Sequence, residues 1–253
     1  MRLAAIFIVW KDTIELLPFA LEAMPAEEII VIWSESSNHG EIDSNYISYA
    51  EYKGLVGKYL FLRFEPNMRL PMAANETAKR NYGLQVAKDL ACSHFIMCDA
   101  DEFYIRSDFE AERRIIQMDD LNGIVHPLKV YVGKPTLWCE DHTIVPGIQK
   151  LYPDTQLGNF KNYPFAYDAQ GHAHIDPTRR TNQTTGIEMS PFYMHHMSYV
   201  RRDIDLKIRN SSANLRRSEA AIKRDIANAA PGYMSELYHR ELKECENLFN
   251  ITI

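Results

Sequence analysis

Four short apolar runs separated by helical segments constrain the fold of this chain more than any other feature. The runs lie at residues 3–9, 29–33, 59–64 and 95–98, and a long helix is expected from about residue 73 to 90. Strands that alternate with helices at this spacing form a largely parallel sheet with helices on both faces. The sequence therefore predicts an α/β fold.

The pattern changes after residue 107. A helix is expected at residues 108–118, and strands are expected at 124–132 and 192–200, the first of which alternates loosely, as an exposed or antiparallel strand would. Residues 135–191 are rich in Pro, Gly, Asn, Tyr and His and show little periodicity, which indicates a functional segment or hidden strands. We predict one domain at residues 1–202 and a helical C-terminal extension at 203–253 that packs on it.

Composition excludes several classes of protein. Of the 253 residues 46% are hydrophobic, which is enough for a sizeable core, and the net charge of −6 argues against a nucleic-acid binder. The four cysteines show no metal-type spacing and are interpreted as free thiols in a reducing compartment. The apolar opening is interpreted as a strand rather than a signal peptide, and no run is long enough for a membrane span. We therefore expect a cytoplasmic protein.

The fourth apolar run leads directly into three acidic residues, Asp99, Asp101 and Glu102. In open α/β sheets, ligands bind beyond the carboxyl ends of the strands, which is where Asp99 and Asp101 are expected to lie. Carboxylates are hard oxygen donors that suit Mg²⁺ or Mn²⁺. Short acidic pairs are also common in solvated turns, so a simple turn remains the alternative for this stretch.

Two motifs together carry a family resemblance. The run Ala-Lys-Arg-Asn-Tyr-Gly-Leu at residues 78–84, followed by Ile-Met-Cys-Asp-Ala-Asp-Glu at 96–102, resembles glycosyltransferases of the GT-A fold and the family 2 type. The segment His-Met-Ser-Tyr-Val-Arg at 196–201, with Lys207 beyond it, is similar to the late histidine segment of that family. The resemblance covers residues 3–104 and 192–207 and little between them. It implies a GT-A (Rossmann-like) sheet with an irregular acceptor-side region.

The resemblance also implies an activity. Such enzymes transfer a sugar from a nucleotide-diphosphate donor to a hydroxyl of a glycan or glycoconjugate acceptor, commonly in polysaccharide synthesis. A Mn²⁺ or Mg²⁺ ion stabilises the charge that develops on the diphosphate. By this resemblance Asp101 is the direct metal ligand, Asp99 reaches the metal through water or binds the donor ribose, and His196 completes the coordination. His195 points to the other face of a strand. Ordinary polar roles at a sheet edge remain the alternative for both histidines.

The resemblance further implies a donor-binding set. Residues at the ends of the first two strands would surround the nucleobase and ribose, and basic residues would meet the diphosphate; the candidates are Val9, Trp10, Asp12, Glu35, Lys79, Arg80, Asp99 and Lys207. A core position is the alternative for Trp10, and a solvated helix face is the alternative for Lys79 and Arg80.

The catalytic base is the hardest residue to assign. An inverting transferase needs a carboxylate that takes the acceptor proton, and we expect it at Asp176 or, as second choice, Glu188. The pair Glu140-Asp141 falls rather early in the chain. A turn role before Pro177 competes with the catalytic role of Asp176. A retaining enzyme would need no such base.

Two other functions remain open at this point. The first is a nucleotidyltransferase that makes sugar nucleotides; that class has a Gly-rich basic loop after the first strand, whereas residues 9–13 here lack glycine. The second is a catalytically silent carbohydrate-binding protein. The aromatic-rich segment 152–167 suits sugar stacking in either a transferase or a binding protein.

Overall fold

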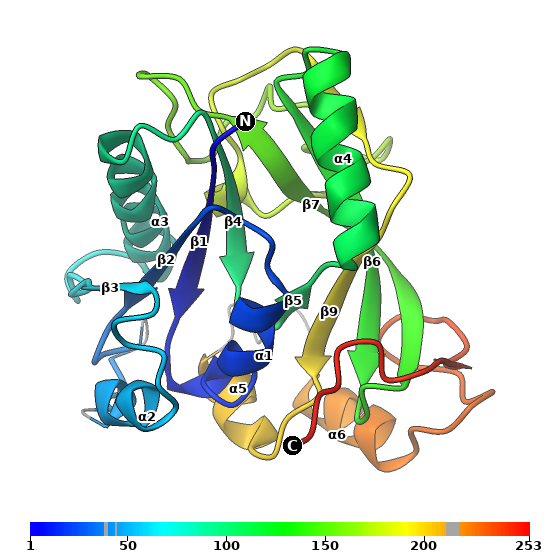
Figure 1. Cartoon of the computed structure of the whole chain (residues 1–253). Coiled ribbons are helices and arrows are strands. Elements are labelled where there is room, and N and C mark those ends of the chain that lie inside the picture. Colours follow the sequence, from blue (N-terminus) through cyan, green and yellow to red (C-terminus); the bar gives the residue numbers. More distant parts are fainter. Residues whose placement is uncertain (38–39, 44, 211–217) are drawn as a thin grey trace.

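The computed structural model describes residues 1–37, 40–43, 45–210 and 218–253. One curved sheet runs through this part of the chain in the strand order β3-β2-β1-β4-β7-β6-β9-β5, with β10 paired to β7 and β8 paired to β6 (Figure 1). The strands are β1 (Leu3–Val9), β2 (Glu28–Trp33), β3 (Leu60–Arg63), β4 (His94–Asp99), β5 (Glu102–Phe103), β6 (Gly123–Val132), β7 (Leu137–Lys150), β8 (Ile187–Met189), β9 (Met194–Tyr199) and β10 (Lys243–Glu244).

The first four strands pair with one another in parallel, as β6 also does with β8 and β9. Ile6 of β1 lies between Ile30 of β2 and Met97 of β4. On the other side of β2, β3 pairs with it in parallel. These are the four apolar runs that the sequence indicated. The predicted α/β class, with a mostly parallel sheet and flanking helices, is confirmed.

Helices cover both faces of the sheet. They are α1 (Leu17–Ala23), α2 (Tyr46–Tyr52), α3 (Met72–Asp89), α4 (Arg106–Met118), α5 (Ile204–Asn210) and α6 (Glu219–Ala227). On one face α3 packs on β1 and β2 so closely that a Cβ at Gly83 would lie 2.4 Å from Ile6 Cγ2. On the other face α1 and α4 bury Leu17 and Phe109 with alternate residues of β1, such as Phe7.

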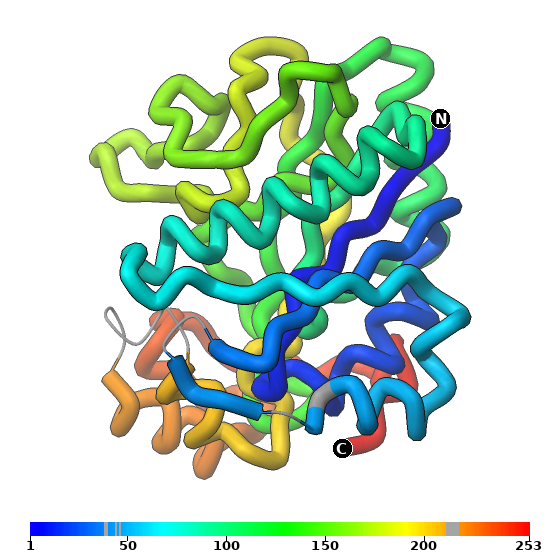
Figure 2. Tube along the Cα trace, turned by 90° about the vertical axis from the view of Figure 1, so that its left-hand side faces the viewer, coloured from blue at the N-terminus to red at the C-terminus, as the bar shows by residue number. Residues whose placement is uncertain are grey.

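The irregular segment contains strands that its sequence did not reveal. Residues 137–150 form β7, which pairs antiparallel with both β4 and β6. Residues 144–149 of this strand are buried without alternation, and Pro146 and Gly147 interrupt the β-type composition. The β6–β7 pairing also has register shifts, which break the period of two on which strand prediction depends. The segment after β7 lies along one side of α3, and the C-terminal segment lies on the other (Figure 2).

The chain beyond residue 203 shares the central core. It contains α5 and α6, and residues 228–253 run through turns and the short strand β10, which pairs with β7. Tyr238, Leu242 and Ile251 are buried together with residues of β6 and β9. None of the described helices is both long enough and apolar enough to cross a membrane. All four cysteines are free thiols.

Candidate functional site

The carboxyl ends of β1, β2 and β4 meet at one edge of the sheet. Ile8 pairs with Asp99 and Val9 with Trp33, so residues after these strand ends converge. They border a cavity of about 130 Å³. Its lining comes from β1 and the turn after it, the end of β2 and the loop that follows, the start of α3, the end of β4, and α5: Ile8, Val9, Trp10, Asp12, Thr13, Ser34, Ser37, Met72, Glu76, Lys79, Asp99, Asp101, Lys207 and Asn210.

Asp101 is buried among three basic side chains. Its Oδ2 forms an ion pair with Arg201 Nη2 and lies 3.3 Å from Lys207 Nζ and 3.6 Å from His196 Nε2. Burial works against the charged carboxylate, but Lys207 and Arg201 outweigh it and hold the pKa of Asp101 well below its ordinary value. Asp101 is therefore an anion whose charge is already balanced by the protein.

Strand pairing explains why His196 lies beside Asp101. Glu102 of β5 pairs with His196 of β9, and the Met197 N–H donates to the Asp101 carbonyl over 2.7 Å. Because side chains alternate along β9, His195 faces away, and its Nδ1 lies 2.8 Å from the hydroxyl of Tyr131. Burial lowers the pKa of His195 to about 3. His196 is thus the histidine of this pair that reaches the carboxylate cluster.

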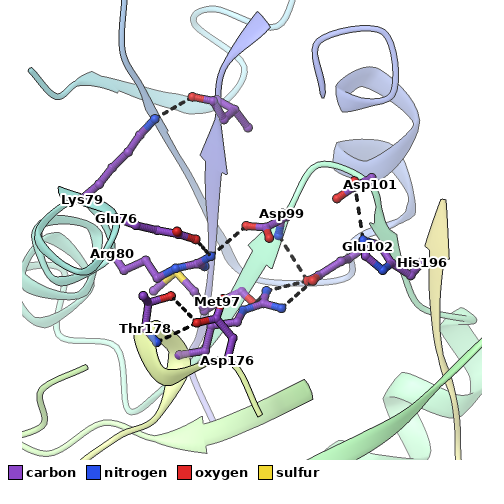
Figure 3. Close-up of polar contacts among 12 residues, drawn as sticks. Glu76, Lys79, Arg80, Met97, Asp99, Asp101, Glu102, Asp176, Thr178 and His196 are labelled. Carbon is purple, nitrogen blue, oxygen red and sulfur yellow. Dashed lines mark hydrogen bonds and ion pairs between the residues drawn. The ribbon is translucent and has the colours of Figure 1, made fainter. Parts of the chain in front are cut away.

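Asp99 is held by a buried arginine of α3. Arg80 Nη2 donates to Glu76 Oε1 over 2.6 Å and to Asp99 Oδ1 over 3.3 Å (Figure 3). Burial opposes the charge on Asp99, but Arg80 and then Arg179 outweigh it and lower the pKa of that carboxyl. The alternative for Arg80, a solvated helix face, is wrong, because its side chain is only 1% exposed.

Glu102 and Arg179 form a second buried pair. Arg179 donates to both carboxylate oxygens of Glu102, over 2.5 Å and 2.6 Å, and to the Met97 carbonyl over 2.8 Å. The Asp99 N–H also donates to Glu102, over 3.2 Å. This bidentate pair ties the 3₁₀ turn η2 (Pro177–Arg179) to the end of β4.

Lys79 is buried rather than on a solvated face. Its Nζ donates to the Val9 carbonyl over 2.7 Å and to Ser34 Oγ over 3.0 Å. Burial lowers the pKa of this ammonium to about 7. Lys79 therefore joins α3 to the ends of β1 and β2 and presents its amine at the wall of the cavity.

The remaining donor candidates lie around the same strand ends. Trp10 is 7% exposed, and its indole N–H donates to the Glu35 carbonyl over 3.2 Å. Glu35 is not one of the residues that line the cavity, and its carboxylate pairs with Arg63 over 2.9 Å. Asp12 lies 3.8 Å from Lys207, and burial raises the pKa of its carboxyl despite this cation.

A second cavity of about 490 Å³ adjoins the first. The two cavities share Met72, Glu76, Asp99 and Lys207 as lining residues. Both Asp176 and Asp141 line the second cavity. Asp176 Oδ1 accepts from the N–H and hydroxyl of Thr178, over 2.8 Å and 2.9 Å, so this aspartate has the turn role expected before Pro177 and also borders the cavity.

The structure does not bring Glu188 to this site. Glu188 is exposed on β8, opposite Ile124 near the amino-terminal end of β6. The amino-terminal end of β6 pairs with the end of β7 that also pairs with the amino-terminal end of β4. Asp99 lies at the opposite, carboxyl end of β4. The second choice for the base is therefore incorrect, because distance along the chain does not tell which end of a sheet a residue occupies.

The donors around Asp101 fit a divalent cation that brings further ligands with it. Asp101 Oδ2 and His196 Nε2 lie 3.6 Å apart, so these two side chains would hold such an ion together. Asp101 Oδ1 is buried and accepts no hydrogen bond within the described part of the chain. The described residues offer no group of three or more His, Cys, Asp or Glu for a metal. Phosphate oxygens and water would have to complete such a shell, as is common for Mg²⁺.

Sequence reasoning missed Arg201, Arg179 and Glu76. Arg201 is the last residue of the segment 196–201. Arg179 lies three positions after Asp176, and Glu76 lies three positions before Lys79, so each is a charged residue close in sequence to a candidate. Glu76 lies four positions before Arg80 on the same helix. The partners of Arg179 and Arg201 are distant in sequence, so only the folded chain shows that these charges meet.

Comparisons with known proteins identify no family. No family model matches this chain, and no curated protein matches it. Among solved structures, S. aureus TarS 1-349 is similar at 12% identity and a TM-score of 0.45 over 90% of this chain and 70% of that chain. The complex of TarS 1-349 with UDP has 13% identity and a TM-score of 0.37, over 53% of this chain and 37% of that chain. A CMP:2-keto-3-deoxy-manno-octonic acid synthetase complexed with CTP has 11% identity and a TM-score of 0.32, over 59% of this chain and 71% of that chain. Likenesses this distant say nothing of function, so the site is interpreted from its own geometry.

Proposed function

We propose that this protein is a glycosyltransferase that moves a sugar from a nucleotide-diphosphate donor to an acceptor hydroxyl. The observation that carries the proposal is the pair of adjoining cavities that share Asp99 and Lys207 at the carboxyl end of β4. A transfer between two substrates needs two adjacent binding spaces with the reacting groups at their junction.

The smaller cavity suits the donor. It lies beyond the ends of parallel strands, where nucleotides bind in α/β sheets. Trp10 supplies an aromatic ring at its wall, and Lys207 and Lys79 supply amines for the anionic diphosphate. A Mn²⁺ or Mg²⁺ ion held by Asp101 and His196 would stabilise the negative charge on the leaving diphosphate.

The larger cavity suits the acceptor and the base. Asp176 is our choice for the carboxylate that takes the proton of the incoming hydroxyl, if configuration is inverted. Two hydrogen bonds from Thr178 fix its Oδ1, which orients the carboxylate at the wall of the cavity. A base held by its own turn is positioned before the acceptor arrives.

Two substitutions separate this activity from simple binding. Wild-type protein is incubated with a panel of nucleotide sugars and Mn²⁺ or Mg²⁺, and release of nucleoside diphosphate is measured. Asp101→Asn should lower the rate on the order of 10²–10³, because it weakens the electrostatic stabilisation of the leaving group. Asp89→Asn, an exposed change at the far end of α3, is the matched control and should keep the wild-type rate.

The same panel tests the alternatives. Release of pyrophosphate from nucleoside triphosphates and sugar 1-phosphates would identify a nucleotidyltransferase instead; the chain after β1 enters a short 3₁₀ turn (Lys11–Thr13) without a glycine-rich loop. Binding of glycans with no turnover of any nucleotide sugar would refute the transferase and favour the silent binding protein.

A further inference from the structure

Two cations and a histidine gather at one oxygen of Asp101. Arg201 Nη2 and Lys207 Nζ both contact Oδ2, and His196 Nε2 faces the same atom. A divalent cation bound to this carboxylate would therefore meet two positive charges at close range, and in a site largely screened from water such repulsion is strong. Binding of the ion at Oδ2, the oxygen that His196 faces, requires that one of the two basic side chains leaves.

Arg201 is fixed in place. Its side chain is fully buried, its Nε donates to the Ser198 carbonyl over 2.8 Å, and its Nη1 donates to the Asp12 carbonyl. With the Asp101 carboxylate as the third, Arg201 therefore donates to acceptors from three segments of the chain. Movement of Arg201 would break all three of these contacts in the interior, which is costly.

Lys207 is held much more loosely. Its contacts with Asp101 and Asp12 are long, 3.3 Å and 3.8 Å, and its side chain is 16% exposed. It extends from the seven-residue helix α5 to the boundary of the two cavities. An ammonium on a flexible four-carbon stem can change partner by rotation alone.

We propose that Lys207 occupies, in the free protein, the side of Asp101 that a divalent cation takes during donor binding, and that Lys207 then transfers to the diphosphate. This inference rests on the proposed function. The exchange keeps the charge on Asp101 balanced in both states, and the diphosphate gains the released ammonium. It follows that the metal ion alone binds weakly to this site and that the diphosphate assists its binding, with equal coupling in both directions.

Two binding measurements without any sugar donor test the exchange. The first is the affinity for Mn²⁺ alone, from the electron paramagnetic resonance signal of the free ion. The second is the affinity for inorganic pyrophosphate alone, from calorimetry. Lys207→Met should bind Mn²⁺ about tenfold more tightly than wild type, because a competing charge is gone, and should bind pyrophosphate about tenfold more weakly. Opposite changes in one variant are the signature of a cation that alternates between the two.

A matched control is available on the same helix. Arg209 carries the same charge two positions away, but its side chain is 58% exposed and faces Glu41 at 3.8 Å. Arg209→Met should leave both affinities at the wild-type value. Lys207→Gln serves as a second variant with the same expectation if Lys207→Met does not fold, which thermal melting reports.

The outcomes separate this inference from the proposed function. An unchanged or weaker Mn²⁺ affinity in the folded Lys207 variants would overturn the exchange, even if wild-type protein turns over a nucleotide sugar. An unchanged pyrophosphate affinity would overturn the transfer of Lys207 to the diphosphate. If wild-type protein turns over no nucleotide sugar, the proposed function fails, and the two affinities still decide the exchange.

Discussion

The buried pair between Glu102 and Arg179 gives a prediction that can be worked from the structure. The side chains are 2% and 6% exposed, and two charge-assisted hydrogen bonds join them. In Arg179→Met, the Glu102 carboxylate keeps one donor among the described residues, the Asp99 N–H at 3.2 Å. Removal of one partner of such a pair costs about 3–5 kcal/mol, since the remaining charge is buried without compensation. That is a large part of a typical total stability of about 5–15 kcal/mol.

The pH dependence of this variant has a definite sign. Burial raises the pKa of Glu102 above its ordinary value, and Arg179 is the strongest influence that lowers it. Without Arg179 the pKa of the folded-state carboxyl rises further. Between the ordinary carboxyl value and this raised value, the folded state holds a proton that the unfolded state has released. The stability deficit of Arg179→Met should therefore shrink as the pH falls through that window.

Urea unfolding of four proteins provides the assay: wild type, Arg179→Met, Glu102→Gln and the double variant. The double variant should be more stable than Arg179→Met alone, because it no longer buries an unpaired charge. The reasoning is refuted if Arg179→Met unfolds at the wild-type urea concentration. It is also refuted if the two single losses simply add in the double variant.

Three further predictions concern other parts of the molecule. Asp176→Asn should abolish most sugar transfer and leave donor affinity near wild type. Asp141→Asn is the control from the same cavity. Equal transfer rates in both variants and in wild type would place the base elsewhere. Burial raises the pKa of Glu112 to about 8. The free energy of unfolding should therefore fall as the pH rises from the ordinary carboxyl pKa to about 8, and Glu112→Gln should remove this pH dependence in urea unfolding. Gly83→Ala should cost about 1–3 kcal/mol in the same assay, because its Cβ would meet Ile6 at 2.4 Å; an unchanged midpoint would contradict the close packing of α3.

The parallel half of the fold was predictable because its signal is local. Buried parallel strands read as continuous apolar runs, and β1, β2 and β4 each appear as one. The long strand β7 was missed, because burial on both sides removes alternation and Pro146 and Gly147 resemble loop residues. Its identity depends on pairing with β4 and β6, which no short window of sequence contains.

The candidate site divides in the same way. Asp99 and Asp101 were found because a strand end and its acidic residues are neighbours in sequence. His196 was chosen from the family resemblance of residues 196–201, and the pairing of β5 with β9 brings it to Asp101. The Glu188 assignment failed, because sequence separation measures neither direction nor register in a sheet.

The charges of the site differ in how firmly they are held, and this difference bears on the proposed function. Arg80 and Arg179 are buried and hydrogen-bonded to carboxylates of the strand end. Arg201 is equally enclosed against Asp101. Such fixed pairs set the geometry of the site and need no reorganisation when charge develops in a reaction. Lys207 differs from these arginines in its long contacts, its partial exposure and its place at the junction of the cavities. Under the proposed function a diphosphate enters this site, and among these four cations Lys207 is the one that can move toward it without breaking the buried hydrogen bonds of the arginines.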